Sequence, residues 1–126
     1  MAKKVVSTPE APAAVGAYSQ AVVANGFVFC SGQVPLDPRT GELVGGSIAD
    51  QTRRCLDNLG AVLRAAGASF DDVVKVTAFL LDMDDFPEFN TAYGEFFGDE
   101  PPARATVAVA GLPKGAQVEI ECVAAV

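Results

Sequence analysis

Residues 101–121 have the sequence PPARATVAVAGLPKGAQVEIE, which predicts two strands joined by a tight turn. Residues 104–109 and 117–123 each alternate at the period of two that a pleated strand imposes. The sequence GLPKG between them is typical of a turn. We therefore expect the two strands to be neighbours in a sheet, with Arg104 on one and Glu119 on the other.

A guanidinium fixed near a carboxylate on two strands is suited to binding a small carboxylated substrate. A connection of about five residues places Arg104 opposite a residue near Cys122, and a shift of one residue reverses the face. An ordinary structural alternative fits the same pattern. In that alternative Arg104 is a solvated residue at a strand start, and Glu119 and Glu121 form the wet face of the next strand. The pattern alone leaves both interpretations open.

A length of 126 residues and a half-hydrophobic composition predict one soluble domain, residues 1–126. The formal net charge of −7 argues against a general nucleic-acid binder or a protein of anionic membrane surfaces, since both need clustered Lys and Arg. The absence of histidine excludes Ser-His-Asp and Cys-His catalysis as well as histidine-based metal sites. An anionic ligand must therefore be bound by a local positive group.

The three cysteines, Cys30, Cys55 and Cys122, are widely spaced and odd in number. Because they form no Cys-x-x-Cys motif, they are typical of reduced, buried thiols in a cytosolic protein. The basic N-terminal stretch has no apolar run long enough for a signal peptide or a membrane span. We therefore expect the protein to be cytoplasmic.

Local signals predict the remaining elements. Asn25-Gly26 is the strongest, because both positions of a two-residue hairpin turn need positive φ. Ser47 can cap a helix, and Asp50 can then interact with the helix N-terminus. The expected order is an extended lead-in over 1–14, strands over 18–23 and 27–31, a loop over 34–46, a helix between Ser47 and Gly67, a strand over 73–81, a helix from Asp84 or Asp85 to Phe97, and the two strands described above.

This order predicts an α+β fold with two helices on one face of a mixed sheet. The strand over 73–81 is apolar on both faces, so the uncovered face needs another cover. A second copy of the chain is the simplest one, and we expect a homo-oligomer with its clefts between subunits. Asn90 lies among aromatic residues expected in the core, and a buried amide there either holds a loop or faces a pocket.

Five short segments carry a family resemblance. They are APAAVGAYSQ (11–20), CSGQVP (30–35), DFPEFN (85–90), PAR (102–104) and LPKGAQVEIE (112–121). Each is weak alone, but in this order and at these separations they are highly specific. The chain resembles the RidA/YjgF family of imine deaminases over nearly its whole length, roughly Val5 to Val126.

The resemblance implies a chorismate-mutase-like fold assembled as a homotrimer, with clefts between subunits. It implies that Arg104 binds the substrate carboxylate and that Glu119 positions or activates the attacking water. The implied reaction is hydrolysis of enamine and imine intermediates, such as 2-aminoacrylate and 2-iminopropanoate, to 2-keto acids and ammonia, without a metal or other cofactor. The other cleft residues carried over from the family are Tyr18, Ser31, Gly32, Asn90 and Thr106.

Two positions depart from the family pattern. Thr106 stands where the best-known deaminases often have cysteine. If this position supplies mainly its main-chain N–H to the substrate carboxylate, threonine serves equally well. Ala17 stands where a proline often precedes the tyrosine, a change that leaves Tyr18 in place.

Two other functions remain open. A non-catalytic family member binds a small carboxylate, such as a 2-keto acid, through the same Arg104. A ribonuclease or translation inhibitor, a description sometimes attached to the family, fits poorly with the acidic charge and the absence of histidine. The presence of both Arg104 and Glu119 favours the deaminase.

Overall fold

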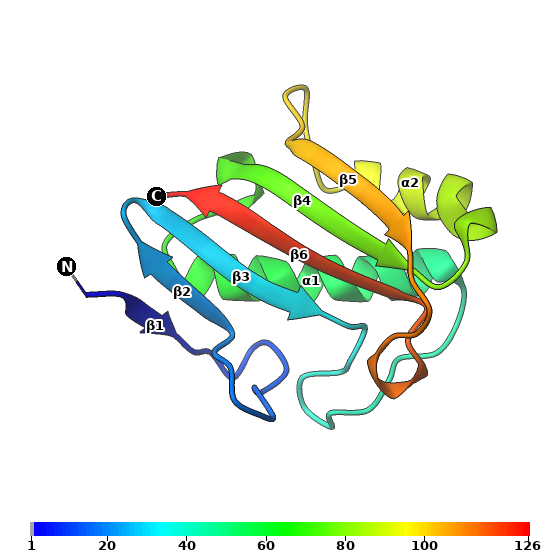
Figure 1. Ribbon diagram of the computed structural model, residues 1–126, viewed down its shortest axis with the longest axis horizontal. Coiled ribbons are helices and arrows are strands. Elements are labelled where there is room, and N and C mark those ends of the chain that lie inside the picture. Colours follow the sequence, from blue (N-terminus) through cyan, green and yellow to red (C-terminus); the bar gives the residue numbers. More distant parts are fainter. Residues whose placement is uncertain (1) are drawn as a thin grey trace.

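The computed structural model describes residues 2–126 and contains a six-stranded sheet with two helices (Figure 1). Met1, part of the lead-in and of the domain expected from the sequence, lies outside the described residues. The elements are β1 (Lys4–Val6), β2 (Ala21–Ala24), β3 (Phe27–Gln33), α1 (Ile48–Ala65), β4 (Val73–Leu80), α2 (Phe86–Gly94), β5 (Ala103–Ala108) and β6 (Val118–Ala125).

The strand order is β1-β2-β3-β6-β4-β5, with β4 and β5 parallel and the other neighbours antiparallel. The expectation that β5 and β6 are neighbours is wrong, because β4 lies between them. Val76 of β4 is the ladder partner of both Arg104 and Cys122, so the expected alignment is present but interrupted by one strand. The nine residues between β5 and β6 easily span the two strand spacings, about 10 Å, that this crossing requires.

The hairpin at Asn25-Gly26 is confirmed. The φ angles are 52° at Asn25 and 80° at Gly26, and β2 pairs directly with β3. The first strand begins at Ala21, later than expected. The lead-in also contains a strand that the sequence did not reveal, since β1 pairs with β2 and three residues are too few to establish a period.

The helix caps follow the sequence at α1 but not at the end of α2. The Oγ of Ser47 accepts a hydrogen bond from the Asp50 N–H (3.1 Å), and the Asp50 carboxylate accepts one from the Ser47 N–H (3.3 Å). α2 ends at Gly94, short of the expected Phe97. The Phe97 ring instead packs edge-on against Phe70, with centroids 5.4 Å apart.

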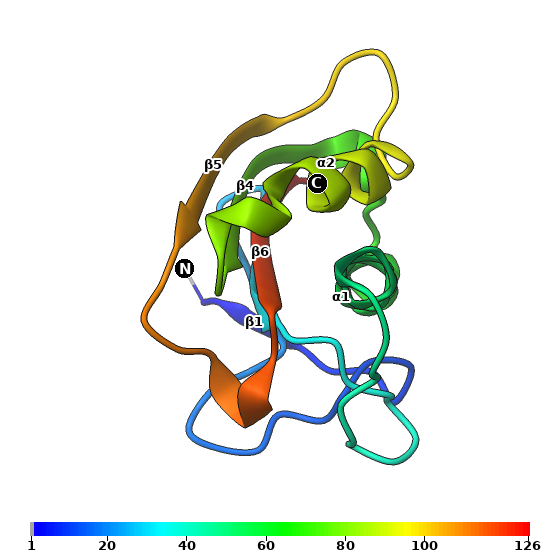
Figure 2. The ribbon, with the colours of Figure 1, turned by 90° about the vertical axis from the view of Figure 1, so that its right-hand side faces the viewer.

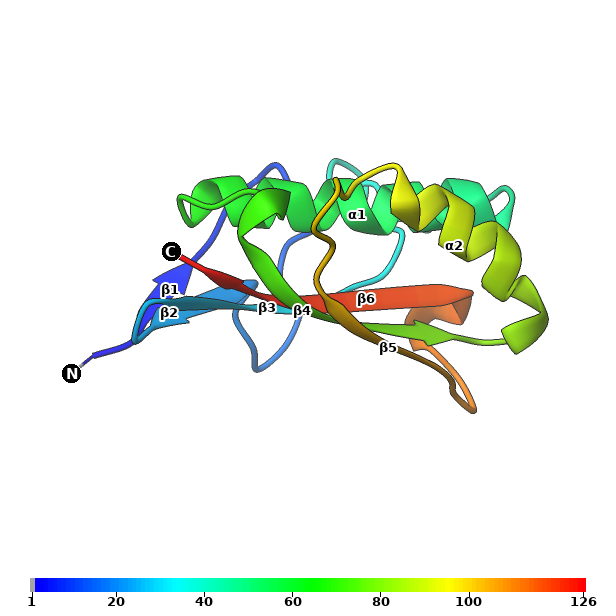
Figure 3. The ribbon, with the colours of Figure 1, turned by 90° about the horizontal axis from the view of Figure 1, so that it is seen from above.

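Both helices cover the same face of the sheet, which confirms the expected α+β arrangement (Figure 3). In the view of Figure 2, α1 is seen nearly end-on beside the sheet. The core lies between these two layers and is built from aliphatic side chains of the sheet and α1 together with the α2 rings of Phe89 and Tyr93. Its largest fully buried hydrophobic side chains are Phe89, Leu56, Leu59, Leu63, Leu80, Ile120, Val28, Val62, Val76 and Val118.

Within residues 2–126, no α-helix covers the opposite face of the sheet (Figure 3). Phe27 is 40% exposed, Phe29 48% and Val107 44%. The rings of Phe27 and Phe29 lie 6.4 Å apart. We call this side of the sheet the uncovered face. An apolar surface of this kind is typical of a protein–protein interface.

Candidate functional site

Glu119 lies on the uncovered face, on β6. Its neighbours Val118 and Ile120 are fully buried beneath the helices, and strand alternation therefore turns Glu119 to the other side. The carboxylate lies directly against Gly32 of β3, where an added Cβ would be only 2.6 Å from Glu119 Oε2. Gly32 therefore lets the backbone of β3 approach Glu119 more closely than a residue with a side chain allows.

A cavity of about 420 Å³ opens beside Glu119, and we call it the Glu119 cavity. Ser31 enters from β3, and its Oγ donates a hydrogen bond to the Ser19 carbonyl (2.6 Å). The half-exposed Tyr18 accepts a hydrogen bond at its hydroxyl from the Val15 N–H (3.4 Å). Four of the expected site residues therefore meet here. The lining residues are Val15, Tyr18, Ser31, Gly32, Val34, Leu36, Pro113, Lys114, Glu119 and Glu121.

The Glu119 carboxyl group is electrostatically perturbed. Partial burial raises its pKa above the ordinary value of 4.5, and the nearby charge of Glu121 raises it further. A carboxyl group whose pKa moves toward neutrality can both accept and return a proton at working pH. Glu119 is therefore suited to general acid–base chemistry.

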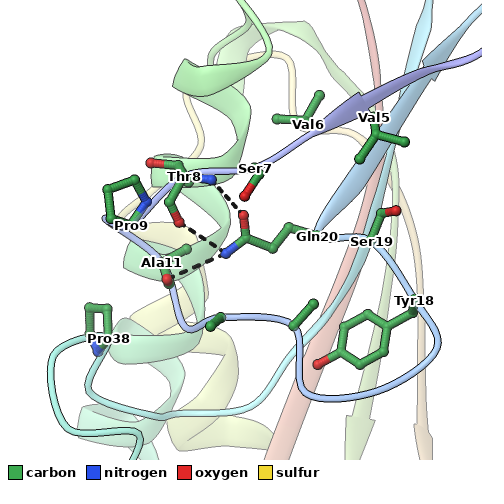
Figure 4. A pocket seen from close by; sticks show the side chains of 12 residues that line it. Val5, Val6, Ser7, Thr8, Pro9, Ala11, Tyr18, Ser19, Gln20 and Pro38 are labelled. Carbon is green, nitrogen blue, oxygen red and sulfur yellow. Dashed lines mark hydrogen bonds between the residues drawn. The ribbon is translucent and has the colours of Figure 1, made fainter.

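The loop that presents Tyr18 is held by the buried side chain of Gln20. The Gln20 Oε1 accepts from the Thr8 N–H (2.7 Å), and Nε2 donates to the carbonyls of Thr8 (3.1 Å) and Pro12 (2.8 Å). Figure 4 shows this amide in a pocket of about 590 Å³ that Tyr18 also lines. Because Tyr18 borders both this pocket and the Glu119 cavity, the bonds of Gln20 help to fix its position.

Arg104 belongs to a second group of residues, between β5 and α2. Its Nη1 donates a hydrogen bond to Asn90 Oδ1 (2.8 Å). Its guanidinium carbon lies 4.7 Å from the ring centroid of Tyr93, 5.5 Å from that of Phe86 and 5.8 Å from that of Phe89, within cation–π range. The cavity beside it, about 380 Å³, is called the Arg104 cavity. It is lined by Asn90, Tyr93, Gly94, Pro101, Pro102 and Arg104.

Polar groups around Arg104 retain unused hydrogen-bonding capacity. None of the ion pairs formed within residues 2–126 includes Arg104. The hydroxyls of Thr106 and Tyr93 are buried and have no hydrogen-bond partner among the described residues. Asn90 is exposed, so the expectation of a buried amide is wrong, and its role in the structure is to hold the guanidinium. A fixed guanidinium with free N–H groups is suited to binding an anion.

A single chain keeps Arg104 and Glu119 apart. Their ladder partners on β4 are Val76 and Phe79, and residues three apart on a strand face opposite sides. The interpretation of Arg104 and Glu119 as neighbours on adjacent strands is therefore wrong within one chain. β5 is an edge strand of the sheet, so the Arg104 cavity lies at its border.

Nearly the whole chain matches a known protein family. The family model described as Endoribonuclease L-PSP, which is that of the RidA/YjgF proteins, matches residues 8–126. The chain belongs to the RidA/YjgF family. One RidA/YjgF relative is the 2-iminobutanoate/2-iminopropanoate deaminase of Rattus norvegicus, which is 48% identical over 122 residues, or 97% of this chain and 89% of that protein.

Solved RidA/YjgF structures have the same fold. YyfA of Yersinia pestis, described as a member of the conserved Rid protein family, superposes with a TM-score of 0.96 at 48% identity, covering 99% of this chain and 100% of that one. TdcF of E. coli, solved with bound serine, gives a TM-score of 0.93 at 41% identity, covering 98% of each chain. The RidA/YjgF resemblance of the sequence and its α+β fold are thereby confirmed.

The sequence does not predict a site role for two residues that line the Arg104 and Glu119 cavities. Tyr93 fits the apolar stripe of a helix and is 95% buried as expected, but it also stacks on Arg104; its position one turn after Asn90 was the available signal. Lys114 lines the Glu119 cavity with a positive φ of 58°. The sequence offered no signal for Lys114, because a lysine in a turn is ordinarily solvated.

Within residues 2–126, no three Cys, Asp or Glu side chains come close enough together to hold a metal ion. Neither described helix combines the length and the hydrophobicity needed to span a bilayer.

Proposed function

We propose that this protein hydrolyses small imines and enamines of the 2-iminopropanoate and 2-aminoacrylate type to 2-keto acids and ammonia. The observation that carries the proposal is that the Arg104 guanidinium is held in place but has no carboxylate partner among residues 2–126. Asn90 and three aromatic rings fix the guanidinium. This arrangement fits the carboxylate of a ligand. The name of the Rattus norvegicus deaminase agrees with the proposal.

In the proposed reaction Arg104 orients the substrate. Two parallel N–H···O bonds to the carboxylate contribute about 1.5–3 kcal/mol. They fix the neighbouring C=N carbon, which is electrophilic and can be attacked by water without a covalent enzyme nucleophile. Holding the carbon and the water in reacting positions lowers the barrier, because the step becomes effectively intramolecular.

Glu119 is proposed to move the protons. It orders the water, accepts a proton as the C–O bond forms, and returns that proton to the departing nitrogen. The C–N bond then breaks, which leaves the 2-keto acid and ammonia. The raised pKa of Glu119 supports this role, since the same carboxyl group must lose and regain a proton in each turnover.

We place this reaction between two copies of the chain, because one chain holds Arg104 and Glu119 on opposite faces of its sheet. In the proposed homotrimer, the Arg104 cavity of one copy meets the Glu119 cavity of the next, which gives three equivalent clefts. The apolar uncovered face supplies a surface suited to such an interface. The other expected residues divide between the two sides, with Tyr18, Ser31 and Gly32 beside Glu119 and Asn90 and Thr106 beside Arg104.

A coupled assay tests this function. A dehydratase generates 2-aminoacrylate from serine, and keto-acid release is followed with and without the protein. We expect acceleration by the wild type and a loss of about 10- to 100-fold in kcat/KM for Arg104→Ala, since a charge-assisted bond is removed. Arg64→Ala, at an exposed arginine near the end of α1, is the matched control and should retain activity. Equal activity of the Arg104→Ala protein and the wild type would contradict the proposal.

A second candidate is a non-catalytic protein that binds a small carboxylate. The TdcF structure with bound serine favours it, because serine is a small molecule that carries a carboxylate. Both candidates use Arg104, so binding does not distinguish them. Turnover distinguishes the two candidates. If the wild type binds a 2-keto acid in calorimetry but leaves imine hydrolysis at the uncatalysed rate, the protein is the non-catalytic binding protein.

A further inference from the structure

Cys30 and Cys122 are direct partners across the β3–β6 ladder. Directly opposed residues of an antiparallel pair have Cα atoms about 4.5 or 5.5 Å apart, and a disulfide accommodates either spacing. Both side chains lie on the helix-covered side, where Cys30 is 6% exposed and Cys122 4%. Both thiols are free in the structure. The backbone therefore already has the spacing that a cross-strand disulfide needs.

The two thiols also interact with each other. A hydrogen bond with Cys122 lowers the pKa of the Cys30 thiol, although burial opposes this effect. The same hydrogen bond and burial both raise the pKa of Cys122. Cys30 is thus the thiol that ionises first, and the thiolate is the form that reacts with oxidants. By contrast, burial raises the pKa of Cys55, whose Sγ hydrogen-bonds to a backbone carbonyl on β6.

We propose that Cys30 and Cys122 form a reversible oxidation site, at which hydrogen peroxide converts the two thiols into a cross-strand disulfide. The Cys30 thiolate attacks one peroxide oxygen, the O–O bond breaks, and a sulfenic acid forms with release of one water. The Cys122 sulfur then attacks the sulfenic sulfur, the S–S bond forms, and a second water leaves. The two thiols give up two electrons, and one peroxide accepts both.

The pair lies close to the Glu119 cavity along β3 and β6, but on the opposite, helix-covered side of the sheet. Cys30 directly precedes Ser31 and Gly32, and Cys122 follows Glu119 by three residues on β6. The β3–β6 ladder shifts register between Cys30 and Gln33, so the segment that packs Gly32 against Glu119 begins at the cysteine pair. A disulfide at this point ties the two strands where the cavity starts. Oxidation is thereby linked to the geometry of the cavity, whatever ligand the cavity binds.

The test exposes the folded full-length protein to hydrogen peroxide and reads sulfur chemistry alone, so it is independent of the proposed deaminase activity. We expect the number of free thiols to fall from three to one and the intact mass to fall by about 2 Da. Trypsin should then release residues 5–39 joined to residues 115–126, because no Lys or Arg interrupts either segment before its end. Dithiothreitol should restore all three thiols.

Single variants provide the controls. Cys55→Ser keeps the pair and should still form the disulfide, whereas Cys122→Ser should leave Cys30 without a partner and form no intramolecular disulfide. Retention of three thiols in the wild type, under conditions that fully oxidise free glutathione, would overturn the proposal. A disulfide that includes Cys55, or one that joins two chains, would overturn it equally.

Discussion

The environment of Glu119 lowers the free energy of unfolding when its carboxyl group is ionised. Burial raises its pKa above 4.5, and therefore the folded protein binds this proton more tightly than the unfolded chain does. Where the unfolded state binds fewer protons, the free energy of unfolding falls as pH rises. The stability contributed by protonated Glu119 is thus present below the ordinary carboxyl pKa and is lost as pH rises through the raised one. Such a cost is typical of a functional carboxylate.

Replacing Glu119 with glutamine should therefore stabilise the folded protein at pH values where Glu119 is ionised. The same replacement should abolish turnover. Below pH 4.5 both proteins carry a neutral side chain at this position, and we expect their melting temperatures to agree. As pH rises, the wild type should lose stability relative to the variant. Melting curves at a series of pH values measure this difference, with Glu42→Gln, at an exposed residue of the 34–46 loop, as the control. A difference that is constant with pH, or of the opposite sign, would contradict the assignment.

At the level of elements, the close approach of the Glu119 carboxylate of β6 to β3 depends on one glycine. An added Cβ at Gly32 lies 2.6 Å from Glu119 Oε2, so the carboxylate must move when the glycine is replaced. The contacted atoms belong to the flexible end of a side chain, and the strands themselves need not shift. A substitution here should therefore displace the Glu119 carboxylate more than it disturbs the fold.

Gly32→Ala is expected to lower kcat by at least about tenfold, because misplacement by 1 Å can cost still more. Gly45→Ala is the matched control, since a Cβ added at Gly45 meets nothing within 4 Å. Circular dichroism and melting curves establish that both variants fold. Full activity of Gly32→Ala would show that the position of the Glu119 carboxylate does not limit the reaction.

The sequence predicts the local parts of the fold better than the strand order. Asn25-Gly26 and the Ser47–Asp50 capping box each act within a few residues, and both are confirmed. The position of β4 between β5 and β6 depends on contacts between segments far apart in the sequence. The alternation of apolar and polar residues within β5 or β6 therefore does not predict it. The resemblance supplies Arg104 and Glu119, but no pattern in the chain places them on opposite faces of the sheet.

On the scale of the whole molecule, the uncovered face accounts for the expected association of several chains. Apolar residues on both faces of the 73–81 strand predict the need for a second cover, and the exposed Phe27, Phe29 and Val107 agree with it. The sequence alone does not identify which two surfaces meet, because that depends on where the folded sheet places each cavity.

A charge on the uncovered face should dissociate the proposed trimer. Phe29→Glu places a carboxylate where an apolar ring is 48% exposed, and burying that charge in an interface is costly. Light scattering should report the 13.0 kDa of one chain in place of about 39 kDa for three chains, with loss of activity. Ala65→Glu, on the exposed side of α1, should leave the assembly intact. A Phe29→Glu protein that keeps the wild-type mass would exclude this face from the interface.

The central claim is that Arg104 of one copy and Glu119 of another form each site. We would test it by mixing two inactive variants, Arg104→Ala and Glu119→Ala, after dissociation and reassembly. In random equal mixtures, one cleft in four receives both intact residues, so activity should recover to about a quarter of the reassembled wild type. A site contained in one chain predicts no recovery. Mixtures as inactive as the separate variants, with wild type restored by the same treatment, would contradict the account.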